Sequence, residues 1–456
     1  MKKSTGAVAL VSAAALLLSA CGGNGDADPT PAGGDSPAET EAAPAEEEAD
    51  TEEDTAAAEE DAEGGEGDEE EEAAPVRDEN VELVIWADND RAEALGEFAQ
   101  QFGDEYGITT QVQVSTDVRA QFSQAHTVGQ GPDIIVGAHD WLGEFVQNGS
   151  VAPVPLSDDV QALFVPESIE ATKFDGQIYG VPYATENLGL MRNTDLAPDV
   201  PATMEELVAK GNELVDAGDA DAPMGAPVGL VGDAYHAFPW LDAYGGGIFG
   251  QNEEGGWDAS NVIIDSPETL QGAEKMSWLA EEGALNVNMD GTAMAAMFGE
   301  GRLPFMITGP WSTSNAEEAG INYAISAIPA FEDGGEPMPF LGVQMFYVSS
   351  SAKNPSVAQE FLNQYVPSPE LQMAMYENAG ERAPALVETL EEVSAQNEDL
   401  AGFSEAGEGA PPMPNIPQMA SVWQPLGQAT ADIINGDDPA DRLKAAQEEI
   451  LANMGN

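Results

Sequence analysis

The sequence predicts an α/β fold in which helices cover both faces of a parallel or mixed sheet. The first reason is a strand–helix–strand–helix–strand succession over residues 81–136. The second is that helix-like and strand-like segments continue to alternate over residues 203–328. The third is that the sequence contains no internal repeat and no second apolar stretch long enough to cross a membrane. Such alternation is typical of layered α/β architectures.

The first succession contains a strand at 81–86, a β-rich segment at 108–114 and a short buried strand at 134–136. Between them, apolar residues at one-face helical spacing predict two helices. The first carries Leu95, Phe98, Ala99, Phe102 and Tyr106, and the second, capped by Thr116 or Asp117, carries Val118, Phe122 and Ala125. Ligands of such sheets bind beyond the carboxyl ends of strands. The polar clusters at 88–91 and 138–141, which follow two strands, are therefore predicted to line a site.

The second half is predicted to add further helices and strands. The predicted helices are 203–217, one that begins after Tyr235, 267–282 and 294–298, and the predicted strands are 227–231, 303–307 and 323–328. Residues 245–250 (GGGIFG) fit the G-x-G-x-x-G pattern, but a dinucleotide loop must follow a strand and open a helix. Here the glycines follow a helical pattern, so we interpret them as a helix stop.

The composition is strongly acidic. The 456 residues include 83 Asp and Glu but only 14 Lys and Arg, which gives a formal net charge of −69. Nucleic-acid binding and attachment to anionic lipid through a basic patch are excluded, because both depend on clustered cations. Self-repulsion of this size opposes compaction unless salt screens it, which suggests the hypothesis of a saline or alkaline habitat. Disulfides are excluded as well, since Cys21 is the only cysteine.

The N-terminus has the features of an export signal. Lys2 and Lys3 precede an apolar stretch at 7–18, and 18–21 (LSAC) resembles a bacterial lipobox in which Cys21 is lipidated. Residues 1–20 are thus predicted to be a lipoprotein signal peptide. Residues 21–78 are predicted to be the lipidated cysteine and a disordered acidic tether, because 22–76 have 22 acidic residues and almost no large apolar side chain. We expect a protein anchored by lipid at the outer face of the cell membrane.

Carboxylates and tryptophans are the candidate binding residues. Asp90, Asp140 and Glu186 follow or end apolar runs, and Trp311 and Trp423 lie near turns. Aromatic faces with nearby carboxylates suit a carbohydrate, whose C–H faces stack on rings while its hydroxyls reach polar groups. Paired carboxylates could alternatively cleave a glycosidic bond. The histidines are far apart and no metal or cofactor motif is found, so we expect neither a metal nor a cofactor.

Several segments resemble the maltose/maltodextrin-binding proteins of bacterial ABC importers, which are extracellular solute-binding lipoproteins of family 1. They are 83–86 (LVIW), 131–135 (GPDII), 138–140 (AHD), 308–311 (TGPW) and 413–419 (MPNIPQM). The resemblance covers about 80–456. It implies a two-lobe periplasmic-binding-protein-like fold with mixed sheets flanked by helices and a hinge of several crossovers. Placed on this chain, the N-terminal lobe is 79–185 plus 341–395, and the C-terminal lobe is 186–340 plus 396–456.

The resemblance also implies roles for individual residues. In the first lobe, Asp90 and Asp140 would accept hydrogen bonds from sugar hydroxyls, and Arg91 would supply a cation in place of a lysine. Glu186 would contact the ligand from the hinge. In the second lobe, the implied contacts are Asp233 where a glutamate is expected, Tyr235, Trp311 and Trp423 as stacking rings, and Met413 on the same wall.

This chain departs from the family pattern at several positions of the site. Gly137 replaces a tryptophan and Trp141 an arginine, so an aromatic surface is expected to have moved from 137 to 141. Gln424 replaces a tyrosine, and Gly427 an arginine. The lost arginine at 141 removes a fork of hydrogen-bond donors.

The expected function is that of a binding protein, not an enzyme. It would capture maltose or maltodextrin-type α-gluco-oligosaccharides and deliver them to the transmembrane permease subunits of an ABC importer. Its expected partners are the sugar, the permease and, through the lipid on Cys21, the membrane, with no nucleic acid and a monomeric state. The alternatives are another oligosaccharide such as trehalose or a cyclodextrin, a secreted glycoside hydrolase, or a sensory lipoprotein.

Overall fold

The computed structural model of the protein describes residues 74–251 and 257–455. The predicted signal peptide, Cys21 and most of the predicted tether lie outside these residues. Arg77 was assigned to the tether, but its side chain is buried and its Nη2 lies 2.7 Å from Oδ2 of Asp133. The folded part therefore begins before residue 78. Among the residues described, no helix is long and apolar enough to cross a membrane.

A mixed sheet organises the first lobe, the name used here for the elements packed on this sheet. Its strands are β1 (Leu83–Ala87), β2 (Thr110–Val114), β3 (Ile134–Ala138), β4 (Val151–Ala152), β7 (Gly180–Glu186), β13 (Gly342–Ser349) and β14 (Ala383–Pro384). They run in the order β14-β7-β13-β3-β1-β2, with β4 paired to β13. β1 is parallel to β2 and β3, whereas β13, β7 and β14 pair antiparallel. The predicted βαβαβ unit is confirmed.

Helices pack on both faces of this sheet, as predicted. The first-lobe helices are α1 (Asn89–Tyr106), α2 (Val118–Thr127), the 3-10 turn η1 (His139–Trp141), α3 (Leu142–Gln147), α4 (Asp158–Gln161), α5 (Pro166–Ala171), α11 (Pro355–Gln364), α12 (Pro369–Asn378) and α13 (Val387–Ser394), with a small hairpin of β5 (Lys173–Phe174) and β6 (Gln177–Ile178). Side chains of α1, α5, α11 and α12 form one core with the sheet. Those of α2 and α3 form a second core on the opposite face.

A smaller sheet of three antiparallel strands organises the second lobe. Its strands are β8 (Gly189–Asn193), β11 (Phe305–Thr308) and β12 (Tyr323–Ser326), in the order β11-β8-β12, and a separate pair is formed by β9 (Phe249–Gln251) and β10 (Trp257–Val262). The second-lobe helices are α6 (Met204–Ala217), α7 (Ala234–Asp242), α8 (Pro267–Glu281), α9 (Gly291–Gly299), η2 (Pro310–Ser312), α10 (Thr313–Glu318), α14 (Glu398–Ala406), η3 (Pro417–Ser421), α15 (Trp423–Ile434) and α16 (Pro439–Met454).

Most second-half predictions are confirmed, but the strand at 227–231 is wrong. Only Gly225 forms a bridge there, parallel to Met306. Gly229 and Gly232 have φ values of 70° and 75°, a region that glycine adopts freely, and the chain turns between them. Leu230 is consequently 72% exposed. The glycines at 245–250 follow α7 and lead into β9, the order expected for a helix stop.

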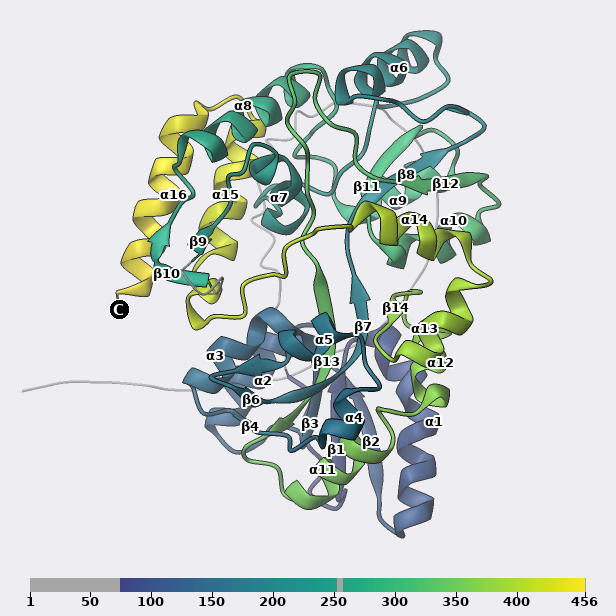
Figure 1. Cartoon of the computed structure of the whole chain (residues 1–456), viewed down its shortest axis with the longest axis vertical. Helices are drawn as coiled ribbons and strands as arrows, with labels where there is room; N and C mark the ends of the chain where they lie inside the picture. Colours follow the sequence, from purple (N-terminus) through teal and green to yellow (C-terminus); the bar gives the residue numbers. More distant parts are fainter. Residues whose placement is uncertain (1–73, 252–256, 456) are drawn as a thin grey trace, which may run out of the picture. The chain divides into compact units, whose positions relative to one another are not determined.

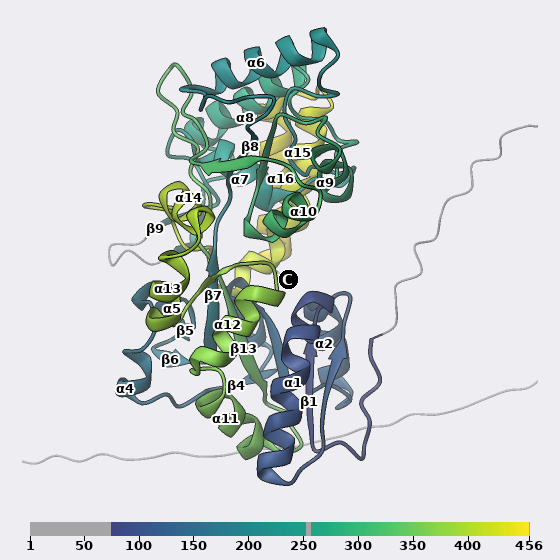
Figure 2. The ribbon, with the colours of Figure 1, turned by 90° about the vertical axis from the view of Figure 1, so that its right-hand side faces the viewer.

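The chain crosses between the two sheets after β7, before β13 and between α13 and α14. Figure 1 shows β7 and β13 rising from the first lobe towards the second, and Figure 2 shows α13 and α14 lying one after the other along this path. Leu341 also bridges to Pro412, so the segment that leads to η3 lies beside one crossover. The α/β fold class is confirmed, and its two sheets are joined by several connections.

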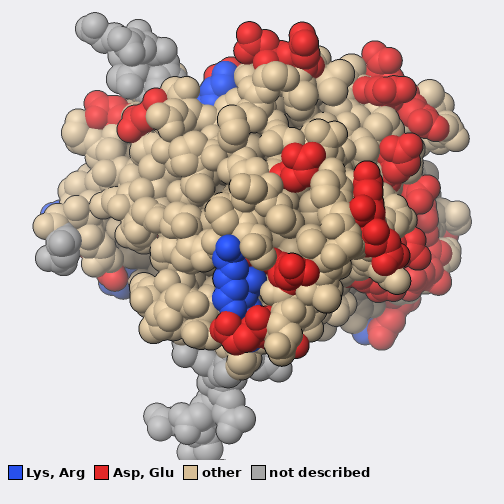
Figure 3. Space-filling model, turned by 90° about the horizontal axis from the view of Figure 1, so that it is seen from below, with Lys and Arg blue, Asp and Glu red and all other residues tan. Residues whose placement is uncertain are grey.

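The surface charge of the described part is dominated by carboxylates. Red side chains stand out across the face drawn in Figure 3 and are dense along one edge, while blue ones are few. Each described Lys or Arg except Arg192 has a carboxylate within ion-pair distance. The few cations are thus held in ion pairs, which is consistent with the exclusion of a polyanion site.

Candidate functional site

The polar cluster after β3 presents a tryptophan that folds back over a glycine. β3 ends at Ala138, and the turn η1 carries His139, Asp140 and Trp141. A Cβ atom at Gly137 would collide with the six-membered ring of Trp141. The indole therefore occupies the space that a side chain at 137 would take. The shift of an aromatic binding surface from 137 to 141 stays a prediction.

A tryptophan ring also lies over a glycine in the second lobe. β11 ends at Thr308, and η2 carries Trp311. A Cβ atom at Gly309 would collide with the ring of Trp311, so this indole also lies over a glycine. The centroid of the Trp311 ring lies 6.4 Å from that of Tyr235 and 6.2 Å from that of His236. Three aromatic rings thus meet at this end of the second-lobe sheet.

Arg91 is buried in the first lobe and held entirely by protein groups. Asp88 caps α1 and forms an ion pair with Nη1 of Arg91. The Arg91 Nε donates to Oη of Tyr183 at 2.5 Å, and Nη2 donates to Oε1 of Gln344 at 2.9 Å. Burial opposes the charge, but Tyr183, Asp88 and Glu186 outweigh it and raise the pKa of Arg91. The side chain is in a position to orient its neighbours.

Glu186 continues this chain of contacts towards the second lobe. Its Oε1 accepts from Nε2 of Gln344 at 2.6 Å, and its Oε2 forms an ion pair with Nε of Arg382. Arg382 lies between α12 and β14, and its guanidinium carbon is 5.5 Å from the centroid of the Trp311 ring. The Glu186 carboxylate, at the end of β7, is therefore linked through Arg382 to an aromatic ring of the other lobe. Sequence reasoning missed Arg382.

Asp140 forms a second link between the lobes. Its Oδ2 accepts from Nε1 of Trp423, the first residue of α15, at 3.2 Å. Nη1 of Arg119 on α2 lies 3.6 Å from the same oxygen. Burial raises the pKa of Asp140, and Arg119 opposes that shift. Arg119, which the sequence did not single out, also pairs with Glu144 at 2.8 Å.

The start of α7 presents two buried polar atoms without a hydrogen-bond partner among the described residues. Asp233 caps the helix: its Oδ1 accepts from the backbone N–H groups of Tyr235 and His236 at 3.0 Å each. Its Oδ2 lies 2.6 Å from Nδ1 of His236. The Oη of Tyr235 and the Nε2 of His236 are both buried and unpartnered. Burial opposes ionisation of Asp233, but the His236 ring and the two backbone bonds hold its pKa below the usual value.

The remaining predicted residues are not part of these contacts. Asp90 is exposed in the first turn of α1, and Gln424 is exposed on α15. The Met413 side chain is buried in the second-lobe core, and its carbonyl oxygen lies 3.1 Å from Nε2 of His139. At Gly427, a Cβ atom would lie 3.3 Å from the carbonyl oxygens of Val231 and Gly232. The turn before α7 therefore occupies the space beside that position.

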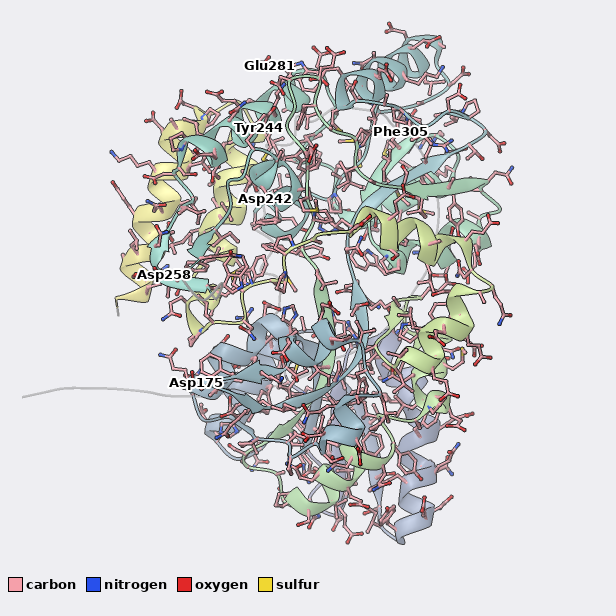
Figure 4. The ribbon with its side chains drawn as sticks, in the orientation of Figure 1. Asp175, Asp242, Tyr244, Asp258, Glu281 and Phe305 are labelled. Carbon is pink, nitrogen blue, oxygen red and sulfur yellow. The ribbon has the colours of Figure 1, made fainter. Side chains whose placement is uncertain are left out.

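Several cavities lie near the crossovers. A cavity of about 260 Å³ is lined by Glu186, Asn187, Pro310 and Leu341, among others. A larger one of about 560 Å³ lies in the second lobe beside Phe238 and Asp242, and none of the predicted site residues lines it. Figure 4 labels Asp242 and Tyr244 at the end of α7. Within residues 74–251 and 257–455, no group of three or more His, Cys, Asp or Glu could hold a metal ion.

Comparison with known proteins gives one family and several relatives. The family model described as "Bacterial extracellular solute-binding protein" matches residues 97–403. A maltotriose-binding protein of Pyrococcus abyssi is 29% identical over 386 residues, or 82% of each chain. A galactooligosaccharide-binding protein of Bacillus subtilis is 28% identical over 80% of this chain and 88% of its own. A maltooligosaccharide ABC transporter solute-binding lipoprotein of Streptococcus pneumoniae is 26% identical over 82% of this chain and 90% of its own.

Proposed function

The chain belongs to the family of bacterial extracellular solute-binding proteins, and on that premise we propose that it captures an α-gluco-oligosaccharide of the maltose or maltodextrin type. It then delivers the sugar to the permease subunits of an ABC importer. Two of the relatives described above are named for maltotriose or maltooligosaccharide, and one is named as an ABC transporter lipoprotein. Members of the family are binding proteins, and we propose no catalysis for this chain.

One observation carries the sugar assignment: Trp311 lies against Tyr235 and His236, whose buried Oη and Nε2 atoms have no described partner. An unpaired buried polar atom costs about 1–3 kcal/mol. A neutral ligand with a flat apolar face and several hydroxyls would cover the indole and satisfy both atoms. A saccharide ring has this combination of surfaces.

The proposed mechanism is capture by closure of the two lobes. Candidate ligand contacts come from both lobes, with Asp140 and Trp141 on the first and Tyr235, Trp311 and Trp423 on the second. A sugar that touches both lobes stabilises the closed state relative to the open one, because only the closed state offers all contacts at once. We further propose that lipid on Cys21 holds the monomeric protein at the outer face of the membrane.

A galacto-oligosaccharide is the second candidate, because one relative of similar identity is named for that ligand. Galactose differs from glucose in the configuration at C4, and the two kinds of oligosaccharide also differ in their glycosidic linkages. We expect hydrogen bonds from a ligand to the unpaired atoms at 235 and 236 to depend on which isomer is bound.

Calorimetric titration of the protein without its lipid tests the proposal. The ligands are maltose, maltotriose, a cyclodextrin, trehalose and a β-galacto-oligosaccharide. We expect maltotriose to bind most tightly, with a dissociation constant in the micromolar range, about −8 kcal/mol. Binding of none of these sugars would refute the proposal. Release of glucose or maltose during incubation with maltotriose would show catalysis instead.

A further inference from the structure

His236 is the polar group of the site whose chemistry the proposed function leaves unassigned. It is the third residue of α7, its side chain is 12% exposed, and its ring stands edge-on to Trp311 at 6.2 Å. The ring also meets that of Tyr235 at an interplanar angle of 86°. Packing between aromatic rings does not by itself use ring nitrogens. The nitrogen atoms of His236 therefore require a separate explanation.

The contacts of the two ring nitrogens define their roles. Nδ1 lies 2.6 Å from Oδ2 of Asp233, and a carboxylate can only accept, so Nδ1 carries the hydrogen. In the neutral ring, Nε2 then bears a lone pair and acts as an acceptor. That atom is buried and has no partner among the described residues. Asp233 thus fixes the tautomer and aims an unused acceptor beside Trp311.

The neighbouring hydroxyl complements this acceptor. The Oη of Tyr235 is also buried and unpartnered. Burial, together with the nearby carboxylates of Glu186 and Asp233, raises the pKa of Tyr235 well above its usual value, so the hydroxyl keeps its hydrogen. One residue therefore offers an acceptor and the next can donate. Two adjacent hydroxyls of one sugar ring match this pair.

We infer that His236 is a specificity-determining residue, whose Nε2 accepts a hydrogen bond from one hydroxyl of the sugar while Tyr235 Oη bonds a neighbouring hydroxyl. The inference rests on the proposed saccharide ligand and deepens it. Asp233 is a positioning residue in this scheme, because both of its oxygens are already occupied by α7. The ligand class is a neutral hexose-containing oligosaccharide with two adjacent free hydroxyls on the ring next to Trp311.

His139 provides an internal reference within the same protein. Its Nδ1 accepts from the backbone N–H of Val343 at 3.1 Å, and its Nε2 lies 3.1 Å from the carbonyl oxygen of Met413. Nε2 of His139 must therefore carry the hydrogen, the tautomer opposite to that of His236. Both nitrogens of His139 are occupied, so a ligand should not alter them.

The first experiment is nitrogen-15 NMR of the histidine side chains, with and without maltotriose. His236 should show the Nδ1–H tautomer, and its Nε2 resonance should move on binding. His139 should show the Nε2–H tautomer and stay unchanged. A protonated or Nε2–H form of His236, or an unmoved Nε2 resonance in the bound protein, would overturn the inference.

The second experiment compares His236→Phe, Tyr235→Phe and wild type against monodeoxy analogues of maltotriose. Wild type should lose about 10- to 100-fold in affinity when the hydroxyl bonded to His236 is missing. The His236→Phe variant should bind maltotriose about 10- to 100-fold more weakly than wild type does. It should bind maltotriose and this deoxy analogue with equal affinity. Tyr235→Phe should lose discrimination at an adjacent hydroxyl. His126→Gln, on the surface of the first lobe, is the control and should bind like wild type.

The outcomes separate the inference from the proposed function. If wild type binds no oligosaccharide, the proposed function fails. If wild type binds maltotriose but His236→Phe keeps the same affinity and the same discrimination for every analogue, only the role of His236 fails. His236→Gln, which retains an acceptor, should recover part of the lost affinity. If His236→Gln unfolds at the normal temperature but recovers none of the affinity for maltotriose, the loss in His236→Phe would reflect packing and not the acceptor.

Discussion

In both lobes a tryptophan indole lies over a glycine, but the polar groups near the two indoles differ in how they are satisfied. In each, a strand ends in a 3-10 turn whose tryptophan lies over a glycine, Trp141 over Gly137 and Trp311 over Gly309. In the first lobe, Asp140 and Arg91 both have protein partners. In the second, buried atoms of Tyr235 and His236 have none among the described residues.

This difference indicates a division of roles. Paired groups rigidify a site because each fixes the position of the next, and removing one leaves the other uncompensated. Unpaired buried groups raise the free energy of the empty site, and a ligand that satisfies them recovers that cost. We therefore expect the first lobe to support the geometry of the site and the second to choose the ligand.

The largest effect is expected from Arg382→Met. The change leaves the carboxylate of Glu186, which is 8% exposed, without its cation. Loss of one partner from a buried ion pair costs about 3 kcal/mol in the free energy of unfolding. Urea denaturation should show this loss. The double variant Glu186→Gln, Arg382→Met should recover most of it, and equal instability of the single and double variants would show that the pairing is not the cause.

Replacement of the two indoles tests the division of roles directly. Trp311→Ala should weaken maltotriose binding by about 2 kcal/mol, because it removes the ring beside the unpaired atoms. Trp423→Ala should have a similar effect, since its indole also bonds Asp140. Trp141→Ala should cost less, as this ring packs edge-on against Phe145 in its own lobe. Calorimetry measures all three, and a greater loss for Trp141→Ala than for Trp311→Ala would reverse the assignment.

The glycines under the indoles offer a finer test. A methyl group at Gly309 or Gly137 would collide with the ring above it and push the tryptophan from its place. We expect Gly309→Ala to weaken binding about tenfold, and Gly137→Ala by a smaller factor. Gly96→Ala on α1 is the matched control, because a Cβ there meets no atom within 4 Å. Equal affinity of Gly309→Ala and wild type would mean that the ring tolerates displacement.

The helices and strands could be predicted from the sequence more fully than the contacts between the side chains of the site. Periodicity was enough for the βαβαβ unit, because its helices and strands each bury one continuous apolar set. The strand at 227–231 failed for a local reason: Val228, Leu230 and Val231 favour a strand, but the glycines at 229 and 232 turn the chain.

Long-range partners were beyond sequence reasoning. Arg382 meets Glu186 across 196 positions of sequence, and Arg119 meets Asp140 only because α2 packs beside the end of β3. The role of His236 could not be predicted, because no pattern in the sequence shows which of its nitrogens is buried. The scarcity of cations was the one available signal for Arg119 and Arg382, because most of so few arginines are expected to pair with one of the many carboxylates.

The smallest effect concerns an acidic group of the second lobe that lies outside the site. Burial raises the pKa of Asp242 to about 6, from a usual value of 3.8, and no described cation pairs with it. Between these two pH values the folded state binds more protons than the unfolded state, so the free energy of unfolding falls as pH rises. Above about pH 6, Asp242 is charged in both states, and its burial destabilises the folded protein by the full amount. Asp242→Asn should therefore stabilise the protein at pH 8 by about 1 kcal/mol, after allowance for partial exposure, but not near pH 4.

Thermal unfolding at the two pH values measures this difference. Asp258→Asn is the control, because hydrogen bonds from Ser260 lower the pKa of that exposed carboxyl and its removal should give no gain at pH 8. If Asp242→Asn stabilised the protein equally at both pH values, burial of the charged carboxylate would not be the cause. A gain confined to pH 8 would show that the second lobe keeps a further polar group unsatisfied, beside a cavity of about 560 Å³ and apart from the residues at 235 and 236.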